Sequence, residues 1–215
     1  MLAYRLNPNP PPTYCRHPQA EKPSLYPFIS LHVVLGTMAL SWLGSMMHFF
    51  YQWSDCSAFF AVFCAVNEST YKHAKIMLFP IFFWWSIVAL VTGEFDRKML
   101  LAFNYALYSA LFLLLIGNYL SIVMHFETIT YDITLFVFCI FYGQLMGALV
   151  YARWFVSDTT STCFHASALF FLVVLLFIST YAPPPFAAYL FADPRNGLVG
   201  IPVNCTSLPF WQFQS

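Results

Sequence analysis

The chain has 215 residues, of which 60% are apolar, 20% are aromatic and only 8% are charged, and its formal net charge is zero. Soluble domains carry about 25% charged residues, so this composition excludes a mainly water-facing surface and indicates an integral membrane protein. The neutral balance and the lack of a basic run give no support to nucleic-acid binding.

The first 25 residues are polar and rich in proline, as in NPNPPPT. They do not read as a signal peptide, because the first apolar run follows them and is too long for an h-region. Arg5 and Arg16 precede the first acidic residue, Glu21. This pattern points faintly to organelle import and leaves the mitochondrial inner membrane as one candidate location, although the prolines argue against an amphipathic presequence.

Five stretches are long and apolar enough to cross a bilayer, which needs about 20 residues of helix. We therefore predict an all-α fold, a polytopic membrane bundle of about five transmembrane helices. The predicted spans are residues 28–52, 74–93, 99–124, 133–155 and 163–182. Within them, Asn118 and Gln144 are expected to make interhelical hydrogen bonds, and Gly143 and Gly147 form a small-xxx-small face for close helix packing.

A sixth apolar run, Ala58–Val66, is too short to span the membrane. It is an interfacial helix, a re-entrant half-helix or an extension of the second span. A single helix over residues 57–93 would be about 55 Å long, against a hydrocarbon core of about 30 Å. The chain must therefore bend or leave the membrane near residues 67–72.

A polar segment, AVNESTYKHAK over residues 65–75, fills this bend. One interpretation is a catalytic or metal site, because His48, Glu68 and His73 are suitable ligands for a divalent ion and suitable acid–base groups. On a straight helix Glu68 and His73 lie about 140° apart. They can converge only if the backbone breaks between them or another helix supplies a ligand.

Two other interpretations of the polar segment remain open. In a structural one, a helical segment places Glu68 and Lys72 in the favourable order for an ion pair, and Asn67 or Ser69 caps the second span. In a ligand-binding one, Lys72 and Lys75 reach a lipid phosphate by snorkelling. The candidate ligand-binding residues are Asn67, Glu68, Ser69, Lys72, His73, Lys75 and Asp193.

The C-terminal segment, residues 183–215, has turn-forming Pro, Gly, Asn and Asp residues with aromatics between them, and it reads as an ordered cap. The predicted organisation is thus an extension over 1–25, a transmembrane bundle over 26–182 and a cap over 183–215. Asn204 lies in an N-x-S/T sequon, whose glycosylation the sequence leaves open. The six cysteines match neither a zinc motif nor a small disulfide framework.

The positive-inside rule predicts the orientation. With the N-terminus inside, the inner side holds six Lys and Arg residues and the outer side holds three. The inner residues are Arg5, Arg16, Lys22, Arg97, Lys98 and Arg153, and the outer ones are Lys72, Lys75 and Arg195. An N-inside, C-outside orientation places His48, the polar segment and Asp193 together on the outer face.

Three segments resemble, in the same order, motifs of an uncharacterised family of small, mostly bacterial, polytopic membrane proteins (domain of unknown function six-five-one-two). They are MHFFYQW, AVNESTYKHAK and YAPPPFAAYLFADPRNGLVGI, and the most specific element is N-E-S-x-x-x-H-x-K. The resemblance covers about residues 28–201. It marks His48, Asn67, Glu68, Ser69, His73, Lys75, Asp193, Pro194 and Gly197 as characteristic positions, but it implies no known activity.

The leading functional hypothesis is a membrane protein whose outer polar pocket binds a lipid head group, a small ligand or a partner subunit. The second is a membrane-embedded hydrolase or transferase that uses His48, Glu68 and His73, with or without a divalent metal. The third is an accessory subunit of a larger membrane complex, or a homo-oligomer, whose aromatic spans make the contacts.

Overall fold

The computed structural model describes residues 25–126, 128–153, 162–193, 197 and 199–201. The predicted N-terminal extension up to residue 24, Pro194, Arg195 and the Asn204 sequon lie outside these residues.

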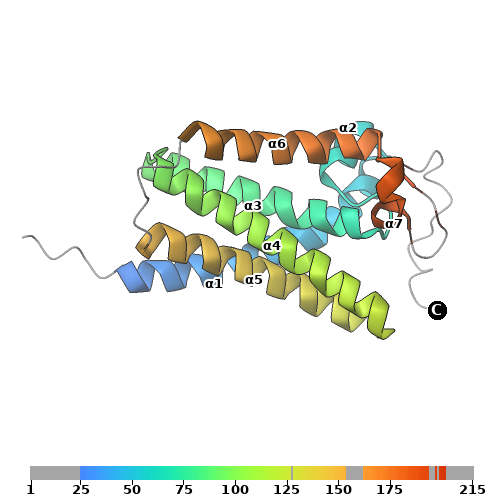
Figure 1. Ribbon diagram of the computed structural model, residues 1–215, viewed down its shortest axis with the longest axis horizontal. Helices are drawn as coiled ribbons and strands as arrows, with labels where there is room; N and C mark the ends of the chain where they lie inside the picture. Colours follow the sequence, from blue (N-terminus) through green and yellow to red (C-terminus); the bar gives the residue numbers. More distant parts are fainter. Residues whose placement is uncertain (1–24, 127, 154–161, 194–196, 198, 202–215) are drawn as a thin grey trace, which may run out of the picture.

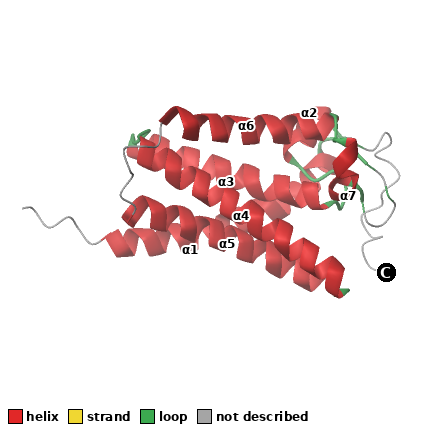
Figure 2. Ribbon diagram, viewed as in Figure 1, coloured by secondary structure: helices red, strands yellow, loops and turns green. Residues whose placement is uncertain are grey.

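Five long helices make up most of the described chain (Figure 1). They are α1 (Leu25–Trp53), α3 (Thr70–Thr92), α4 (Arg97–Met124), α5 (Ile129–Arg153) and α6 (Thr162–Tyr181). Each is long and apolar enough to cross a membrane. Figure 2 shows no strand among the described residues, where the only β-type contact is one isolated bridge, Ala192 with Val199. The predicted all-α polytopic bundle is confirmed, and the protein is an integral membrane protein.

Three short elements gather at one end of the bundle, at the right of Figure 1. They are α2 (Ala58–Phe63), η1 (Pro185–Ala187) and α7 (Ala188–Phe191). We call this the α7 end, and the opposite one the α3–α4 turn end. The short apolar run is therefore a separate helix and not an extension of the second span, because the chain turns extended at Cys64 before α3 begins.

The second span starts at Thr70, four residues before its predicted start, and continues through Pro80. At its other end Gly93 adopts a left-handed φ of 68°, which stops the helix. The side chain of Asp96 then caps α4, accepting a 2.9 Å hydrogen bond from the backbone nitrogen of Met99. The α3–α4 turn is thus defined by ordinary capping chemistry.

Helices α4 and α5 pack most closely, through the predicted small-residue face. A Cβ atom on Gly143 would lie 2.6 Å from the backbone oxygen of Ala106, and one on Gly147 would lie 2.4 Å from Cζ2 of Trp85. These distances are too short for any side chain larger than hydrogen. The motif therefore makes a contact within the chain, between α5 and helices α3 and α4.

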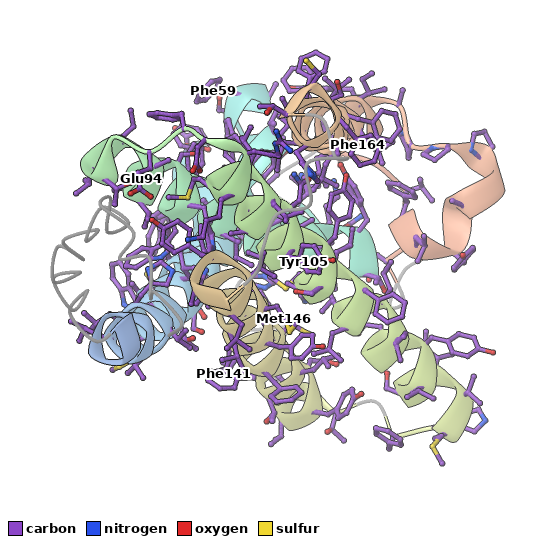
Figure 3. All side chains as sticks on the ribbon, turned by 60° about the vertical axis from the view of Figure 1, so that its left-hand side comes forward. Phe59, Glu94, Tyr105, Phe141, Met146 and Phe164 are labelled. Atoms are coloured by element: carbon purple, nitrogen blue, oxygen red, sulfur yellow. The ribbon has the colours of Figure 1, made fainter. Side chains whose placement is uncertain are left out.

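The outside of the bundle is covered by apolar side chains, as Figure 3 shows for the labelled Phe59 and Phe164, each 66% exposed. Such a surface suits lipid and not water. The Gln144 side chain lies against His32 of α1, so it meets a neighbouring helix as expected, although its amide atoms fall short of strict hydrogen-bond geometry. Nδ2 of Asn118 is buried without a hydrogen-bond partner among the described residues.

Candidate functional site

The polar segment divides into two parts, an irregular connection over residues 65–69 and the first turns of α3 from Thr70 onward. Ser69, with φ −74° and ψ 154°, is the N-cap residue of α3, and its carbonyl accepts from the backbone nitrogen of Lys72 at 2.9 Å. Its side chain makes no capping bond but donates to Oδ1 of Asn67 at 2.8 Å. The cap position predicted for Ser69 is right, whereas the side-chain bond goes to the preceding turn.

This break in the backbone brings the acid–base candidates together. Oε2 of Glu68 lies 3.8 Å from Nε2 of His73, and the imidazole rings of His48 and His73 are 5.4 Å apart, centroid to centroid. The side chains of Glu68 and His73 are each 24% exposed, so the pair is accessible. For these side chains to converge, the sequence required a backbone break between Glu68 and His73 or a residue from another helix. Both the break and a nearby residue of the first span, His48, are present.

The same three side chains do not form a ready metal site. Among the described residues, no group of three or more His, Cys, Asp or Glu side chains is placed to hold a metal ion. A divalent ion would need ligands to converge at about 2.0–2.2 Å from His nitrogens and carboxylate oxygens. The arrangement therefore fits proton transfer or hydrogen bonding to a ligand better than metal coordination.

The lysines face the other side of α3, toward α2 and α6. Lys75, fully buried, donates to the backbone oxygen of Ala61 and, at 3.4 Å, to Oγ1 of Thr180. Ala61 lies in the last turn of α2, where backbone carbonyls lack helical partners and attract cations. Lys75 therefore joins α2, α3 and α6.

Tyr71 completes this structural contact. Its hydroxyl donates to the backbone oxygen of Leu176 and lies 3.1 Å from Oγ1 of Thr180. The sequence did not single out Tyr71 or Thr180. The one signal in the sequence was that Thr180 is a polar residue near the end of an apolar span. This position does not reveal which residue it bonds to.

Lys72 differs from Lys75 because no described carboxylate or carbonyl accepts from it. It is 1% exposed, and its ammonium lies 5.4 Å from the centroid of the Tyr71 ring and beside the ammonium of Lys75. The expected ion pair between Glu68 and Lys72 is not formed, since Glu68 precedes the helix and contacts His73 instead. Within the described part of the chain, Lys72 is thus a buried amine beside Lys75, and no carboxylate there pairs with it.

The C-terminal segment packs against the polar segment. Nδ2 of Asn67 donates to the backbone oxygen of Phe191 at 3.4 Å, and the backbone nitrogen of Glu68 donates to Oδ2 of Asp193 at 3.5 Å. The rings of Tyr71 and Phe191 are 4.4 Å apart. Asp193, expected among the ligand-binding residues, thus contacts the site, and its backbone oxygen accepts from Gly197, which has a left-handed φ of 69°.

A protein-family model covers most of the chain. The model described as "Family of unknown function (DUF6512)" matches residues 27–201. The chain belongs to this family. The match covers most of α1 and every later element as far as residue 201. It confirms the family that the sequence resembles, whereas the N-E-S-x-x-x-H-x-K motif and the mostly bacterial distribution stay predictions. No curated protein and no solved structure matches the chain significantly.

Proposed function

We propose that the α7 end of this DUF6512 protein binds the phosphate of a lipid head group. The observation that supports this proposal is the buried ammonium of Lys72, which has no anionic partner among the described residues. An isolated buried charge is costly, so buried charges are normally paired or bound to an ion. A phosphate would supply both the charge and the acceptor oxygens.

A lipid is favoured over a free anion because α2 and α6, which contact each other at the α7 end, carry exposed apolar side chains there. Phe59 and Phe60 on α2 and Phe177 and Ile178 on α6 are all exposed apolar side chains. Acyl chains would cover them, and a head group would lie at the level of α2. Asn67 and Asp193 would then hold the cap over the bound head group.

Native mass spectrometry of the full chain in mild detergent tests this proposal. Phosphatidic acid and phosphatidylcholine are added at equal concentration, and we expect retention of the anionic lipid at least several-fold above the zwitterionic one. Lys72→Met should abolish this preference and Lys72→Arg should keep it. Lys98→Met is the matched control, because Lys98 lies at the other end of the bundle over the Tyr151 ring.

Equal retention of both lipids by the wild-type protein would contradict the proposal. A Tm increase with inorganic phosphate but not with phosphatidic acid would instead identify a soluble anion as the ligand. Because the Lys72→Met protein could fail to fold, the wild-type comparison of the two lipids is the deciding measurement.

A second candidate function is acid–base catalysis on a lipid ester or phosphodiester. It is supported by the contact between Glu68 and His73, with His48 beside it. A carboxylate next to an imidazole orients the ring and stabilises its protonated form, and a second imidazole can serve as the complementary acid or base. Incubation with phospholipids and mass analysis of the products tests this candidate, with His73→Ala and Glu68→Gln expected to remove any turnover.

We infer that the N-terminus is inside and the α7 end is outside. The distribution of Lys and Arg favours this orientation. Protease protection of terminal tags in sealed vesicles tests the orientation. A C-terminal tag found on the cytosolic side of the membrane would overturn it.

A further inference from the structure

A second polar group joins three helices inside the bundle. It consists of His32 on α1, Trp84 on α3 and Gln144 on α5, and we call these three residues the His32 contact. Nε1 of Trp84 donates to Nε2 of His32 at 3.4 Å. The fully buried side chain of Gln144 pairs with the same imidazole. One histidine side chain therefore connects α1 to both α3 and α5.

The donors and acceptors of these groups define the protonation state of His32. An indole N–H can only donate, so Nε2 of His32 must be an unprotonated acceptor. A neutral imidazole then carries its one proton on Nδ1, which can donate to the amide oxygen of Gln144. The His32 contact is thus complete only with a neutral imidazole in this one tautomer.

Protonation of Nε2 would turn this acceptor into a donor. Two N–H groups, one on His32 and one on Trp84, would then point at each other, and repulsion would replace the hydrogen bond. Within the described part of the chain, His32 is the hydrogen-bond acceptor of Nε1 of Trp84, and no second one is present. A buried indole N–H that loses its acceptor is unfavourable, so protonation works against the contact between α1 and α3.

The close packing around Gly36, one turn after His32, would pass this change on to the helices. A Cβ atom on Gly36 would lie 3.2 Å from Nε1 of Trp84 and 3.4 Å from Oε1 of Gln144. Glycine therefore lets α1 lie directly against the two partners of His32. In such a tightly packed region the side chains have little room to turn away, so loss of the Trp84 bond is expected to move α1 relative to α3.

His32 is placed where protons can reach it from the α3–α4 turn end. It is the second residue of its membrane span and is partly exposed. It also lines a small apolar cavity together with Tyr151. The hydroxyl of Tyr151 donates to Glu94, and the ammonium of Lys98 lies 4.5 Å from the centroid of its ring. Glu94 and Lys98 have opposite charges, so this titratable group as a whole adds no net charge beside His32.

We propose that His32 is a proton-operated contact, which holds α1 against α3 while its imidazole is neutral and releases them when it is protonated from the α3–α4 turn end. Histidine is the side chain that ordinarily changes charge near neutral pH, at about pH 6.5. The proposal rests on the direction of the Trp84 bond and on the packing at Gly36. It does not depend on lipid binding at the α7 end.

Nuclear magnetic resonance of the full chain in lipid nanodiscs, with nitrogen-15 in its histidines and tryptophans, tests this proposal. At about pH 8 we expect His32 to be the Nδ1–H tautomer with Nε2 unprotonated. Between about pH 8 and about pH 4 the indole N–H signal of Trp84 should shift together with the titration of His32. Over the same range, deuterium exchange of the α1 peptide around His32, corrected for the pH dependence of the intrinsic rate, should become at least several-fold faster.

His32→Gln separates the proton from the hydrogen bond, because glutamine offers Trp84 an acceptor but does not titrate. In this variant the Trp84 signal and the corrected exchange should be the same at both pH values. His125→Asn is the matched control. His125 follows α4 at the end away from the α3–α4 turn, and asparagine tolerates its left-handed φ of 54°, so this variant should keep the wild-type titration of Trp84.

Three results would overturn the proposal. They are a proton on Nε2 of wild-type His32 at about pH 8, a wild-type Trp84 signal that stays unchanged down to about pH 4, and an equal shift of that signal in His32→Gln. The first two are measured on the wild-type protein, so they decide the question if His32→Gln does not fold.

Discussion

The carboxylate of Glu68 lies 3.8 Å from Nε2 of His73, although a straight helix would point these two side chains about 140° apart. The extended backbone at Ser69, immediately before α3, makes the contact possible. It also places the pair within reach of His48 on α1, whose ring is 5.4 Å from that of His73. A bend required by membrane thickness therefore also assembles an accessible polar group at the α7 end.

The coupling between Glu68 and His73 should be measurable but small. Both side chains are 24% exposed, and accessible ion pairs contribute about 0.2–1 kcal/mol. A double-mutant cycle with Glu68→Gln and His73→Ala, read by unfolding in detergent, should give a coupling energy in that range. Strict additivity of the two effects would show that the contact is not energetically significant.

The same two variants should impair lipid retention or folding more than Lys98→Ala or Arg153→Ala. The reason is position, since Glu68 and His73 lie at the proposed site, whereas Lys98 and Arg153 begin and end helices at the opposite end of the bundle. The yield of monodisperse protein and the retention of phosphatidic acid are the readouts. Equal tolerance at all four positions would remove the distinction between the two ends.

The helices and the bend could be predicted from the sequence, because both follow from apolar length and bilayer thickness. The rotation of each helix could not. The spans are apolar on every face, so periodicity does not tell which side chains are buried. Lys75 is buried against Ala61, and Tyr71 bonds to α6 over a hundred residues away, and neither partner leaves a local signal in the sequence.

The buried hydroxyl of Tyr71 should contribute measurably to stability. It donates to the backbone oxygen of Leu176 and lies next to Thr180, and one such bond typically contributes about 0.5–1.5 kcal/mol. Tyr71→Phe should lower the free energy of unfolding by that amount and speed deuterium exchange near the α7 end of α6. Tyr119→Phe is the control, because Tyr119 is 66% exposed, and no change is expected there. A Tyr71→Phe protein as stable as the control would contradict this role.

The close contact at Gly147 should not tolerate a methyl group. A Cβ atom there would lie 2.4 Å from Trp85 and 2.9 Å from the Cβ of Ala106, and overpacking of this kind typically costs about 1–3 kcal/mol. Gly147→Ala should therefore lower the Tm in detergent clearly. Ala39→Val adds carbon at an exposed position of α1 and should change the Tm little. Equal effects of the two substitutions would argue against the close packing of α5 on α3 and α4.

The thiol of Cys64 should be unreactive in the folded protein. Burial raises its pKa from 9.0 to about 11, an effect that the nearby charge of Lys75 partly opposes. At pH 8 roughly one thiol in a thousand is then ionised, so a maleimide should label Cys64 only after unfolding in SDS.

The same thiol should make the stability of the protein depend on pH. Because the pKa of Cys64 is higher in the folded state than in the unfolded state, the neutral thiol favours folding at low pH. This contribution, about 3 kcal/mol at most, is lost as the pH rises from about 9 to about 11. Cys64→Ala should reduce the loss of stability in that range, measured as Tm against pH. An identical alkaline decline in wild type and variant, or rapid labelling of Cys64 in the folded wild-type protein at pH 8, would contradict the prediction.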